Sequence, residues 1–384
     1  MSFASLWNLD PSVIYLNHGS FGACPLAVLA AQAKLRDEME REPVDFLSRN
    51  LPTRIDAARD ALAPFLGVDG SDLVFVPNAT AGVNAVLRSL AFDRGDELLV
   101  TNHTYAACRK AVEFVACHAG VRVVTATLPF PCRDEGAIIA AIMGAVSVRT
   151  RLVLIDHVTS PTAMILPAKR LVEELRLRGI DTLVDGAHAP GMLPLALSDL
   201  GAAYYTGNAH KWLCAPKGAA FLHVRRDRQA CLHPNVISHG YSCGFRAEFD
   251  WTGTADPTPY LCIPEALRFV GGLLPGGWPE IMATNHTLTL KARELLLDAL
   301  QVDAPCPAAM IGSMASIPLP KPAIDSIAYH LDLSGLNGWL RQRGIEIWLH
   351  PHPVGLLRLS AQLYNHVDQY LELARALREV FEGP

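Results

Sequence analysis

Short apolar runs alternate with longer amphipathic stretches between roughly residues 70 and 225, a pattern typical of strands alternating with helices. The predicted strands cover residues 73–76, 97–101, 122–126, 151–156, 181–185, 204–206 and 219–224. The predicted helices between them cover residues 79–90, 105–119, 134–145 and 168–178. Because apolar strands separated by helices favour a mostly parallel sheet buried on both faces, we expect an α/β fold with a seven-stranded sheet covered by helices.

The composition and the hydrophobic pattern of the chain change after about residue 265, which indicates a second, smaller unit. A Gly/Pro-rich stretch at 271–277 precedes a long predicted helix at 278–300, and a Pro-rich linkage at 304–322 follows. The chain closes on a short strand at 355–360 and a helix that ends near residue 381. We expect a large domain over residues 31–265 and a smaller α+β domain over 266–384, against which an N-terminal segment, residues 1–30, packs.

Composition narrows the class of protein. Half of the residues are apolar, 18% are charged and the formal net charge is −5, so the chain can bury a sizeable core. Without a basic stripe or an apolar run of about 18 residues, we expect neither a nucleic-acid partner nor a membrane span. Nine scattered cysteines without a CxxC pair, and no secretory signal, favour reduced thiols and a cytoplasmic location.

The first candidate for chemistry is Lys211, which follows a predicted strand within Tyr-Tyr-Thr-Gly-Asn-Ala-His-Lys-Trp at 204–212. An apolar setting of this kind lowers the pKa of a lysine and favours a neutral amine that can attack an aldehyde. Asp185 ends the preceding strand, in Asp-Gly-Ala-His at 185–188, and could hold a ring nitrogen protonated. Taken alone, Asp185 could equally cap a helix and Lys211 could lie on an ordinary loop, but the pair at two strand ends is more specific.

Three supporting positions follow other predicted elements. The start of the helix after residue 78 carries Asn, Thr and Gly and is either a phosphate cradle or an ordinary N-cap, with Thr80 as a hydroxyl donor. His103 follows a strand and could stack on a bound ring or be structural. Arg358, inside an apolar strand, needs an anion, which is either a substrate carboxylate or an internal partner. The chain has no GxGxxG or GxxxxGK[ST] motif, which argues against a nucleotide-dependent oxidoreductase or a P-loop.

Together with Tyr-Leu-Asn-His-Gly-Ser-Phe-Gly-Ala-Cys-Pro at 15–25, these motifs resemble the fold-type I, pyridoxal-phosphate-dependent enzymes of the class V aminotransferase superfamily, in particular the isopenicillin N epimerase-like branch. The resemblance runs from there to residue 365. It implies an aspartate aminotransferase-like fold and pyridoxal 5′-phosphate as a Schiff base on Lys211. It also implies a homodimer, because Thr254 lies in a segment that reaches the phosphate of a neighbouring subunit.

The resemblance assigns the remaining roles residue by residue. Lys211 is the Schiff-base lysine and proton shuttle, Asp185 pairs with the pyridine nitrogen, His188 approaches the phenolic oxygen and His103 stacks on the ring. The phosphate is surrounded by Ala79, Thr80, Asn208 and His210. Arg358 binds the substrate carboxylate, and Asn17 and His18 border the substrate.

The reaction stays open at this point. The resemblance implies action at Cα or Cβ of an amino acid, as an epimerase or a β-eliminating carbon–sulfur lyase, with transamination as the alternative and a non-catalytic sensor or scaffold as the rival class. Desulfurases of this superfamily carry a catalytic cysteine shortly before the carboxylate arginine, whereas residues 307–357 contain no cysteine here. That chemistry is therefore not expected.

Some positions could belong to the pocket or be structural. These are His233, His239, Tyr241, His350 and His352, and the possible second acids are Tyr105, His239 and Tyr241. The two histidines of Trp-Leu-His-Pro-His at 348–352 have no carboxylate or cysteine partner nearby in the sequence, so we expect no metal site.

Overall fold

The structure is a computed structural model that describes residues 3–322, 326–351 and 355–382. Its largest sheet has seven strands, as predicted. In spatial order they are β2 (Leu73–Val76), β8 (Ala220–Val224), β7 (Tyr204–Asn208), β6 (Asp181–Asp185), β5 (Thr150–Asp156), β3 (Glu97–Thr101) and β4 (Arg122–Ala126). Only β8 runs antiparallel to its neighbours, so the prediction of a mostly parallel sheet is confirmed.

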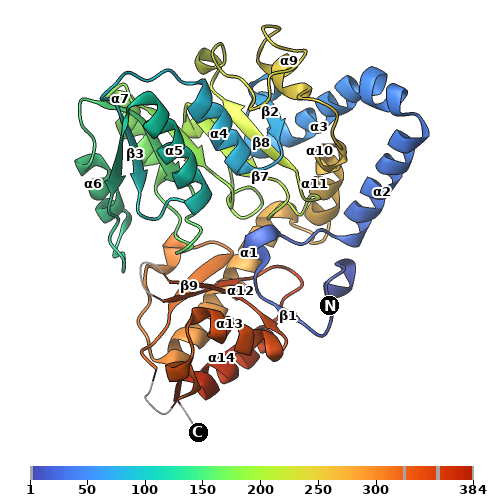
Figure 1. Cartoon of the computed structure of the whole chain (residues 1–384). Helices are drawn as coiled ribbons and strands as arrows, with labels where there is room; N and C mark the ends of the chain where they lie inside the picture. The colour runs from blue at the N-terminus through green and yellow to red at the C-terminus, as the bar shows by residue number, and fades with distance from the viewer. Residues whose placement is uncertain (1–2, 323–325, 352–354, 383–384) are drawn as a thin grey trace.

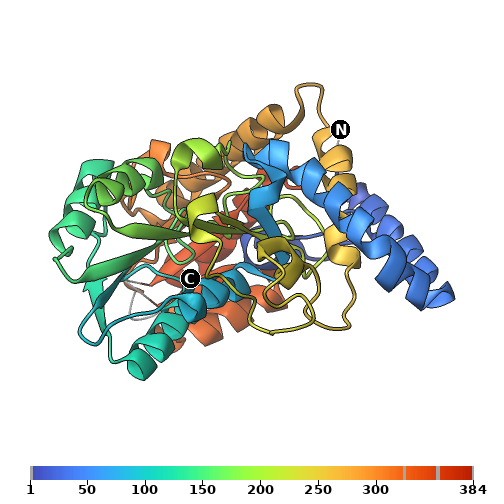
Figure 2. The same ribbon diagram turned by 90° about the horizontal axis from the view of Figure 1, so that it is seen from above.

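Alternate residues of these strands belong to two different hydrophobic clusters. On β2, Leu73 and Phe75 face one cluster, whereas Val74 and Val76 face the other. The second cluster is covered by α4 (Ala79–Ser89) and α5 (Ala106–Ala119), and the first by α3 (Leu51–Leu66), α6 (Glu135–Gly144) and α7 (Ala168–Leu177). Because side chains alternate along a strand, helices on both faces require apolar residues throughout, which is why these strands are continuous apolar runs (Figure 2).

The C-terminal part carries a separate, antiparallel sheet in the order β11 (Trp348–His350), β12 (Leu356–Ser360) and β9 (Met314–Pro318). Two helices, α12 (Gly277–Leu300) and α14 (Val367–Glu382), pack against each other and α12 against β9, with α13 (Leu333–Gln342) following in the chain between β9 and β11 (Figure 1). Three short helices fill the connection from the large sheet to α12: α9 (Phe245–Asp250), α10 (Thr258–Leu261) and α11 (Ile263–Gly271). Another short helix, α8 (Leu197–Leu200), connects β6 to β7.

The N-terminal residues join the two parts. Strand β1 (Ile14–Tyr15) pairs in parallel with β10 (Ile345–Glu346), and α1 (His18–Phe21) lies between the large sheet and the C-terminal part (Figure 1). The next helix, α2 (Leu26–Arg41), buries Val28 and Gln32 and leaves its other residues at least partly exposed. Its apolar face is therefore too narrow for the helix to be predicted from the hydrophobic pattern of the sequence. The predicted domain limits at residues 30 and 265 stay predictions.

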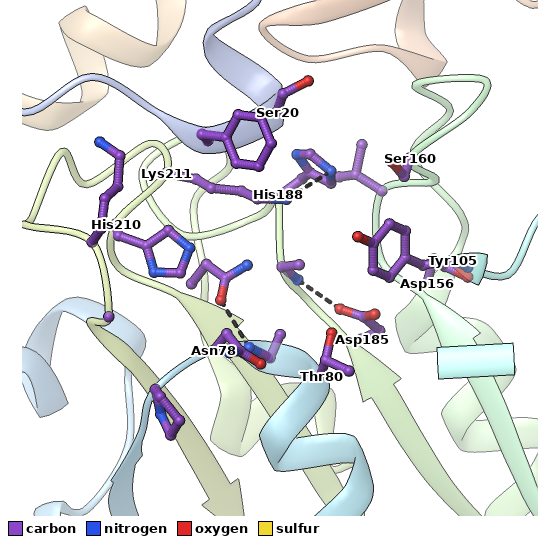
Figure 3. A pocket seen from close by; sticks show the side chains of 18 residues that line it. Ser20, Asn78, Thr80, Tyr105, Asp156, Ser160, Asp185, His188, His210 and Lys211 are labelled. Atoms are coloured by element: carbon purple, nitrogen blue, oxygen red, sulfur yellow. Dashed lines mark hydrogen bonds between the residues drawn. The ribbon is translucent and has the colours of Figure 1, made fainter. Parts of the chain in front are cut away.

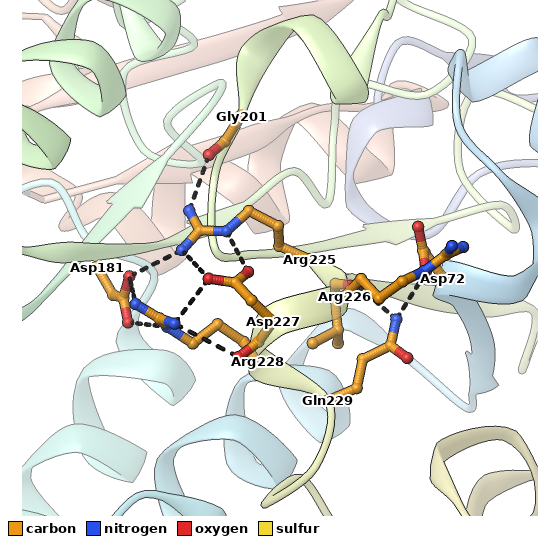
Figure 4. A network of polar contacts seen from close by, with 9 residues as sticks. Asp72, Asp181, Gly201, Arg225, Arg226, Asp227, Arg228 and Gln229 are labelled. Carbon is orange, nitrogen blue, oxygen red and sulfur yellow. Dashed lines mark hydrogen bonds and ion pairs between the residues drawn. The ribbon is translucent and has the colours of Figure 1, made fainter.

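A network of ion pairs lies at the end of the large sheet where β2 and β6 begin. Asp181 begins β6 and accepts a hydrogen bond from Nε of Arg228 at 2.6 Å, while Arg225 lies 3.5 Å from the same carboxylate (Figure 4). Arg226 pairs with Asp72, just before β2. Each such partly exposed pair contributes little, about 0–1 kcal/mol, but together they tie the loop after β8 to β6 and β2. Lys211 lies at the other end of the strands, where β5, β6 and β7 end.

Candidate functional site

A cavity of about 740 Å³ opens at the carboxyl ends of β5, β6 and β7 (Figure 3). Eight of the residues singled out from the sequence line it: Ala79, Thr80, Tyr105, Asp185, His188, Asn208, His210 and Lys211. They come from the ends of β6 and β7, from the start of α4 and, for Tyr105, from the position just before α5. The carboxyl edge is where open α/β sheets bind ligands, since the loops there leave a crevice. The fold thus brings these residues together around one cavity, and the roles expected of them stay predictions.

Lys211 lies in the turn that follows β7. Its Nζ is 3.2 Å from Nε2 of His188, and the two side chains meet at one wall of the cavity (Figure 3). Burial and, to a smaller extent, the positive charge of Arg358 lower the pKa of Lys211 to about 7, while the negative charge of Asp185 opposes them. A substantial fraction of the amine is therefore neutral near pH 7 and able to attack a carbonyl carbon.

Asp185 is the last residue of β6 and is almost fully buried. Its Oδ1 accepts the backbone N–H of Ala187 at 3.0 Å, and its Oδ2 accepts the thiol of Cys108 at 3.2 Å. Burial raises the pKa of Asp185, while these two donors and the positive charge of Lys211 oppose that rise. In so dry a setting, a carboxylate at this position would interact strongly with a protonated ring nitrogen.

The start of α4 is tied to the end of β7. Asn78 caps the helix by accepting the N–H of Ala81 at 2.8 Å, and Oδ1 of Asn208 accepts the N–H of Ala79 at 2.8 Å. Thr80 and His210 border the same region of the cavity. The positive end of the helix dipole makes this corner favourable for an anion such as a phosphate.

Arg358 lies in the middle of β12 and is only 2% exposed. Its guanidinium donates to the backbone oxygen of Ser160 at 2.7 Å and to Oγ of Ser20 at 2.9 Å, and it stacks on the ring of Trp348 at 4.3 Å. Both serines line the cavity, although Arg358 itself does not. Among the described residues no carboxylate pairs with this buried cation. Because an unpaired buried charge is costly, binding of an anion beside Arg358 would be favourable.

Asn17 and His18 hold neighbouring groups rather than line the cavity. Nδ1 of His18 contacts the hydroxyl of Tyr364 at 2.8 Å and Nε2 contacts the backbone oxygen of Lys211 at 3.0 Å. Oδ1 of Asn17 accepts the hydroxyl of Ser20 at 2.6 Å. Gly22 has a φ of 69°, and a Cβ there would come within 2.2 Å of the backbone oxygen of His210. The N-terminal motif therefore packs directly against the turn that carries Lys211.

Two other predicted positions lie apart from the cavity lining. Nδ1 of His103 bonds Oγ1 of Thr162 at 2.9 Å and its buried Nε2 has no partner, while Tyr105, two residues later, lines the cavity. Thr254 is exposed and is not among the lining residues. The stacking role of His103 and the intersubunit role of Thr254 stay predictions.

The remaining histidines and tyrosines are distributed elsewhere. Nδ1 of His233 pairs with Glu248 at 2.6 Å, and His239 lines an apolar hollow beside Trp251. Neither these residues nor Tyr241 and His350 line the cavity of Lys211, and His352 lies outside the described residues. Of the three possible second acids only Tyr105 borders it. Within the described ranges, no three His, Cys, Asp or Glu side chains gather so as to hold a metal ion.

The sequence reasoning missed several lining residues, of which Asp156 is the most informative. It ends β5 and is the register partner of Asp185 across the parallel pair β5–β6. Its place at a strand end was a usable signal, because the same reasoning selected Asp185. Ser20, Ser160 and Lys217 also line the cavity and carried no comparable signal.

Known proteins of similar sequence point to one family. A family model described as aminotransferase class-V matches residues 16–326. Isopenicillin N epimerase from Streptomyces clavuligerus is 37% identical over 392 residues, which cover 96% of this chain and 95% of that protein. A probable chloroplastic L-cysteine desulfhydrase from Arabidopsis thaliana is 32% identical over 396 residues, which cover 96% of this chain and 83% of that protein.

Solved structures with the same architecture are more distant in sequence. A cystine C–S lyase in complex with cysteine persulfide has a TM-score of 0.81 at 20% identity, covering 97% of this chain and 99% of that one. An apo cysteine desulfurase from Thermococcus onnurineus NA1 has a TM-score of 0.83 at 19% identity, covering 100% and 99%. At such identities the likeness establishes the fold alone, and it confirms the predicted fold class.

Proposed function

This chain belongs to the aminotransferase class-V family, and on that premise we propose that it removes the α-proton of an amino acid with Lys211 as the base. The family match confirms the predicted family, the prediction of an enzyme, and pyridoxal phosphate as its cofactor. One observation carries the proposal: Arg358, a buried arginine with no anionic partner among the described residues, is held by two serines of the cavity in which Lys211 has a pKa of about 7.

The cavity residues fit pyridoxal phosphate. Lys211 offers an amine that can hold the aldehyde carbon, Asp185 a carboxylate for the ring nitrogen, and the start of α4 a corner for the phosphate. Nδ1 of His188 is buried and has no partner within the described ranges, as expected of a group that would meet a polar ligand atom. The volume, about 740 Å³, lies within the range typical of cofactor sites, roughly 300–1,000 Å³.

When bound, pyridoxal phosphate supplies an electron sink for the pair released from Cα. The protein contributes binding and proton transfer. Arg358 would bind the substrate carboxylate, with its fork already oriented by Ser160 and Ser20. Asp185 would keep a proton on the ring nitrogen, and the Nζ of Lys211 would take the proton from Cα. His188, 3.2 Å from Nζ, would orient that amine.

The fate of the deprotonated substrate is either epimerisation or β-elimination of a sulfur leaving group. The relatives named isopenicillin N epimerase and L-cysteine desulfhydrase support these two outcomes, and transamination is the alternative. Epimerisation needs a second acid, for which Tyr105 is the candidate that lines the cavity. A desulfurase with a cysteine nucleophile is disfavoured, because no cysteine is among the described residues that line the cavity and the sequence of residues 307–357 contains none.

A panel of amino acids in heavy water tests the proposal. L-cysteine, cystine, cysteine conjugates and non-sulfur amino acids would be incubated with the holoenzyme, and α-deuterium, pyruvate, keto acid and inverted enantiomer would be measured together. At least one substrate should exchange its α-hydrogen with wild-type protein and fail to do so with Lys211→Ala. If Lys211→Ala turns over that substrate at the wild-type rate, the role assigned to Lys211 is wrong.

The active unit would be a homodimer with composite sites. Thr254 is exposed in the single chain and lies outside the cavity lining, so its predicted contact with a phosphate requires a second copy. The test is a mixed dimer of Lys211→Ala and Thr254→Ala subunits: one intact site should restore up to about a quarter to a half of wild-type activity. If sedimentation shows that the fully active protein is a monomer, the composite site is contradicted.

A cytoplasmic location is supported by the cysteines, all nine of which are free thiols. Among the described residues no helix combines the length and apolar character needed to cross a membrane. Fractionation of cells that express a tagged chain, with the tag read in each compartment, tests the location.

A further inference from the structure

Two buried carboxyl groups lie side by side at the floor of the cavity. Asp156 and Asp185 are register partners on neighbouring parallel strands, and both line the cavity (Figure 3). Strands in a sheet are about 4.8 Å apart, and partners in register project their side chains to the same face. Both side chains are almost fully removed from water, so two full negative charges here would repel strongly.

The two groups differ in their hydrogen bonds. Asp185 receives two donors, the N–H of Ala187 and the thiol of Cys108. From the part of the chain that the structure describes, Asp156 receives one donor, the N–H of Tyr105 at 3.3 Å, and its buried Oδ2 receives none. Because donors stabilise a carboxylate, the charge belongs on Asp185 and the proton on Asp156.

The charged groups around Asp156 agree with this distribution. Burial raises its pKa well above the usual range, and the negative charge of Asp185 raises it further, whereas Lys211 acts in the opposite direction. The thiol of Cys108 on α5 has its own pKa raised by burial and by Asp185, so it stays neutral. Tyr105, also on that side, has a raised pKa and is likewise uncharged at pH 7.

We propose that Asp156 is a neutral carboxylic acid that acts as a positioning residue of this site. Its Oδ1 accepts the backbone N–H of Tyr105, the residue just before α5, and so holds Tyr105 at the cavity. The proton lies on Oδ2, the buried oxygen to which no described residue donates. The two carboxyl groups then carry a single negative charge, which stays on Asp185. The inference rests on the proposed function and deepens it, since it explains why the negative charge proposed to pair with the ring nitrogen stays on Asp185 alone.

Infrared spectroscopy of the holoenzyme with ¹³C-labelled aspartate tests the protonation directly. At pH 7 the wild type should show the carbonyl stretch of a protonated, buried carboxyl group. That band should vanish in Asp156→Asn and persist in Asp185→Asn and in the control Asp181→Asn, whose carboxylate is ion-paired at the other end of β6. Loss of the band in Asp185→Asn with retention in Asp156→Asn, or no band in the wild type, would overturn the proposal.

Activity gives a second readout. Asparagine is neutral and can both accept the N–H of Tyr105 and donate, whereas leucine can do neither and leaves that N–H unpaired. Asp156→Asn should therefore retain at least tenfold more activity than Asp156→Leu. Equal losses in both variants would mean that the acidic group itself is required and would contradict a positioning role. The infrared result needs no turnover, so failure of the proposed reaction would leave it unaffected.

Discussion

Nε2 of His18 lies 3.0 Å from the backbone oxygen of Lys211. Burial lowers the pKa of His18 to about 3, so the imidazole is neutral and only one of its nitrogens carries a hydrogen. A backbone oxygen can only accept, which places that hydrogen on Nε2 and makes Nδ1 the acceptor of the Tyr364 hydroxyl. The N-terminal motif is thus a structural support for the turn that carries Lys211.

His18→Ala is expected to destabilise the protein and displace Lys211. It leaves a buried carbonyl and a buried hydroxyl unpaired, each at a cost of about 1–3 kcal/mol, so the free energy of unfolding should fall by several kcal/mol. Denaturant unfolding measures that loss. His118→Ala is the control, because His118 also bonds a backbone oxygen, that of Phe114, but is exposed. Equal losses in the two variants would remove the special role of His18.

The attachment of pyridoxal phosphate to cofactor-free protein should depend on the protonation of Lys211. Only the neutral amine attacks an aldehyde, and the pKa of Lys211 is about 7, so the rate should rise about tenfold per pH unit below pH 7 and level off above it. Stopped-flow absorbance measures this rate, and borohydride reduction followed by peptide mapping identifies the labelled lysine. A midpoint near pH 10, or label on another lysine, is the contradicting result.

Asp185→Asn should reduce kcat by about a hundredfold or more. The amide keeps the shape of the side chain but loses the charge that, in the proposed function, would hold the ring nitrogen protonated. A hundredfold loss corresponds to about 2.7 kcal/mol. Steady-state kinetics with the best substrate of the panel measures the effect. Asp181→Asn, at the other end of the same strand, should stay within about twofold of the wild type, since its partly exposed ion pair lies far from the cavity.

Arg358→Lys should raise KM and lower kcat/KM by about tenfold to a hundredfold. Lysine keeps the positive charge but loses the planar fork that Ser160 and Ser20 orient and that binds a carboxylate through two hydrogen bonds. Arg343→Lys is a matched control, because Arg343 also stacks on a tryptophan, Trp339, yet pairs with Glu379 at the surface. An unchanged KM for Arg358→Lys would show that the substrate carboxylate binds elsewhere.

The sequence by itself determined the sheet and the residues at its strand ends. Runs that are apolar throughout are a local property, so each of the seven strands was located to within two residues at either end. Lys211 and Asp185 were found because they follow such runs, and a strand end in a parallel sheet has a known neighbourhood. For α2, with two buried residues, the local signal was too weak.

Tertiary structure alone decided which distant groups meet. His18 and Lys211 are 193 residues apart, and Arg358 and Ser160 are 198 apart, so no spacing along the chain could reveal either contact. The pairing of Asp156 with Asp185 depends on the order and register of β5 and β6, which are set by packing of the whole sheet. Hydrogen bonds and burial, which exist only in the folded chain, then assign the charge to one carboxyl group and the proton to the other.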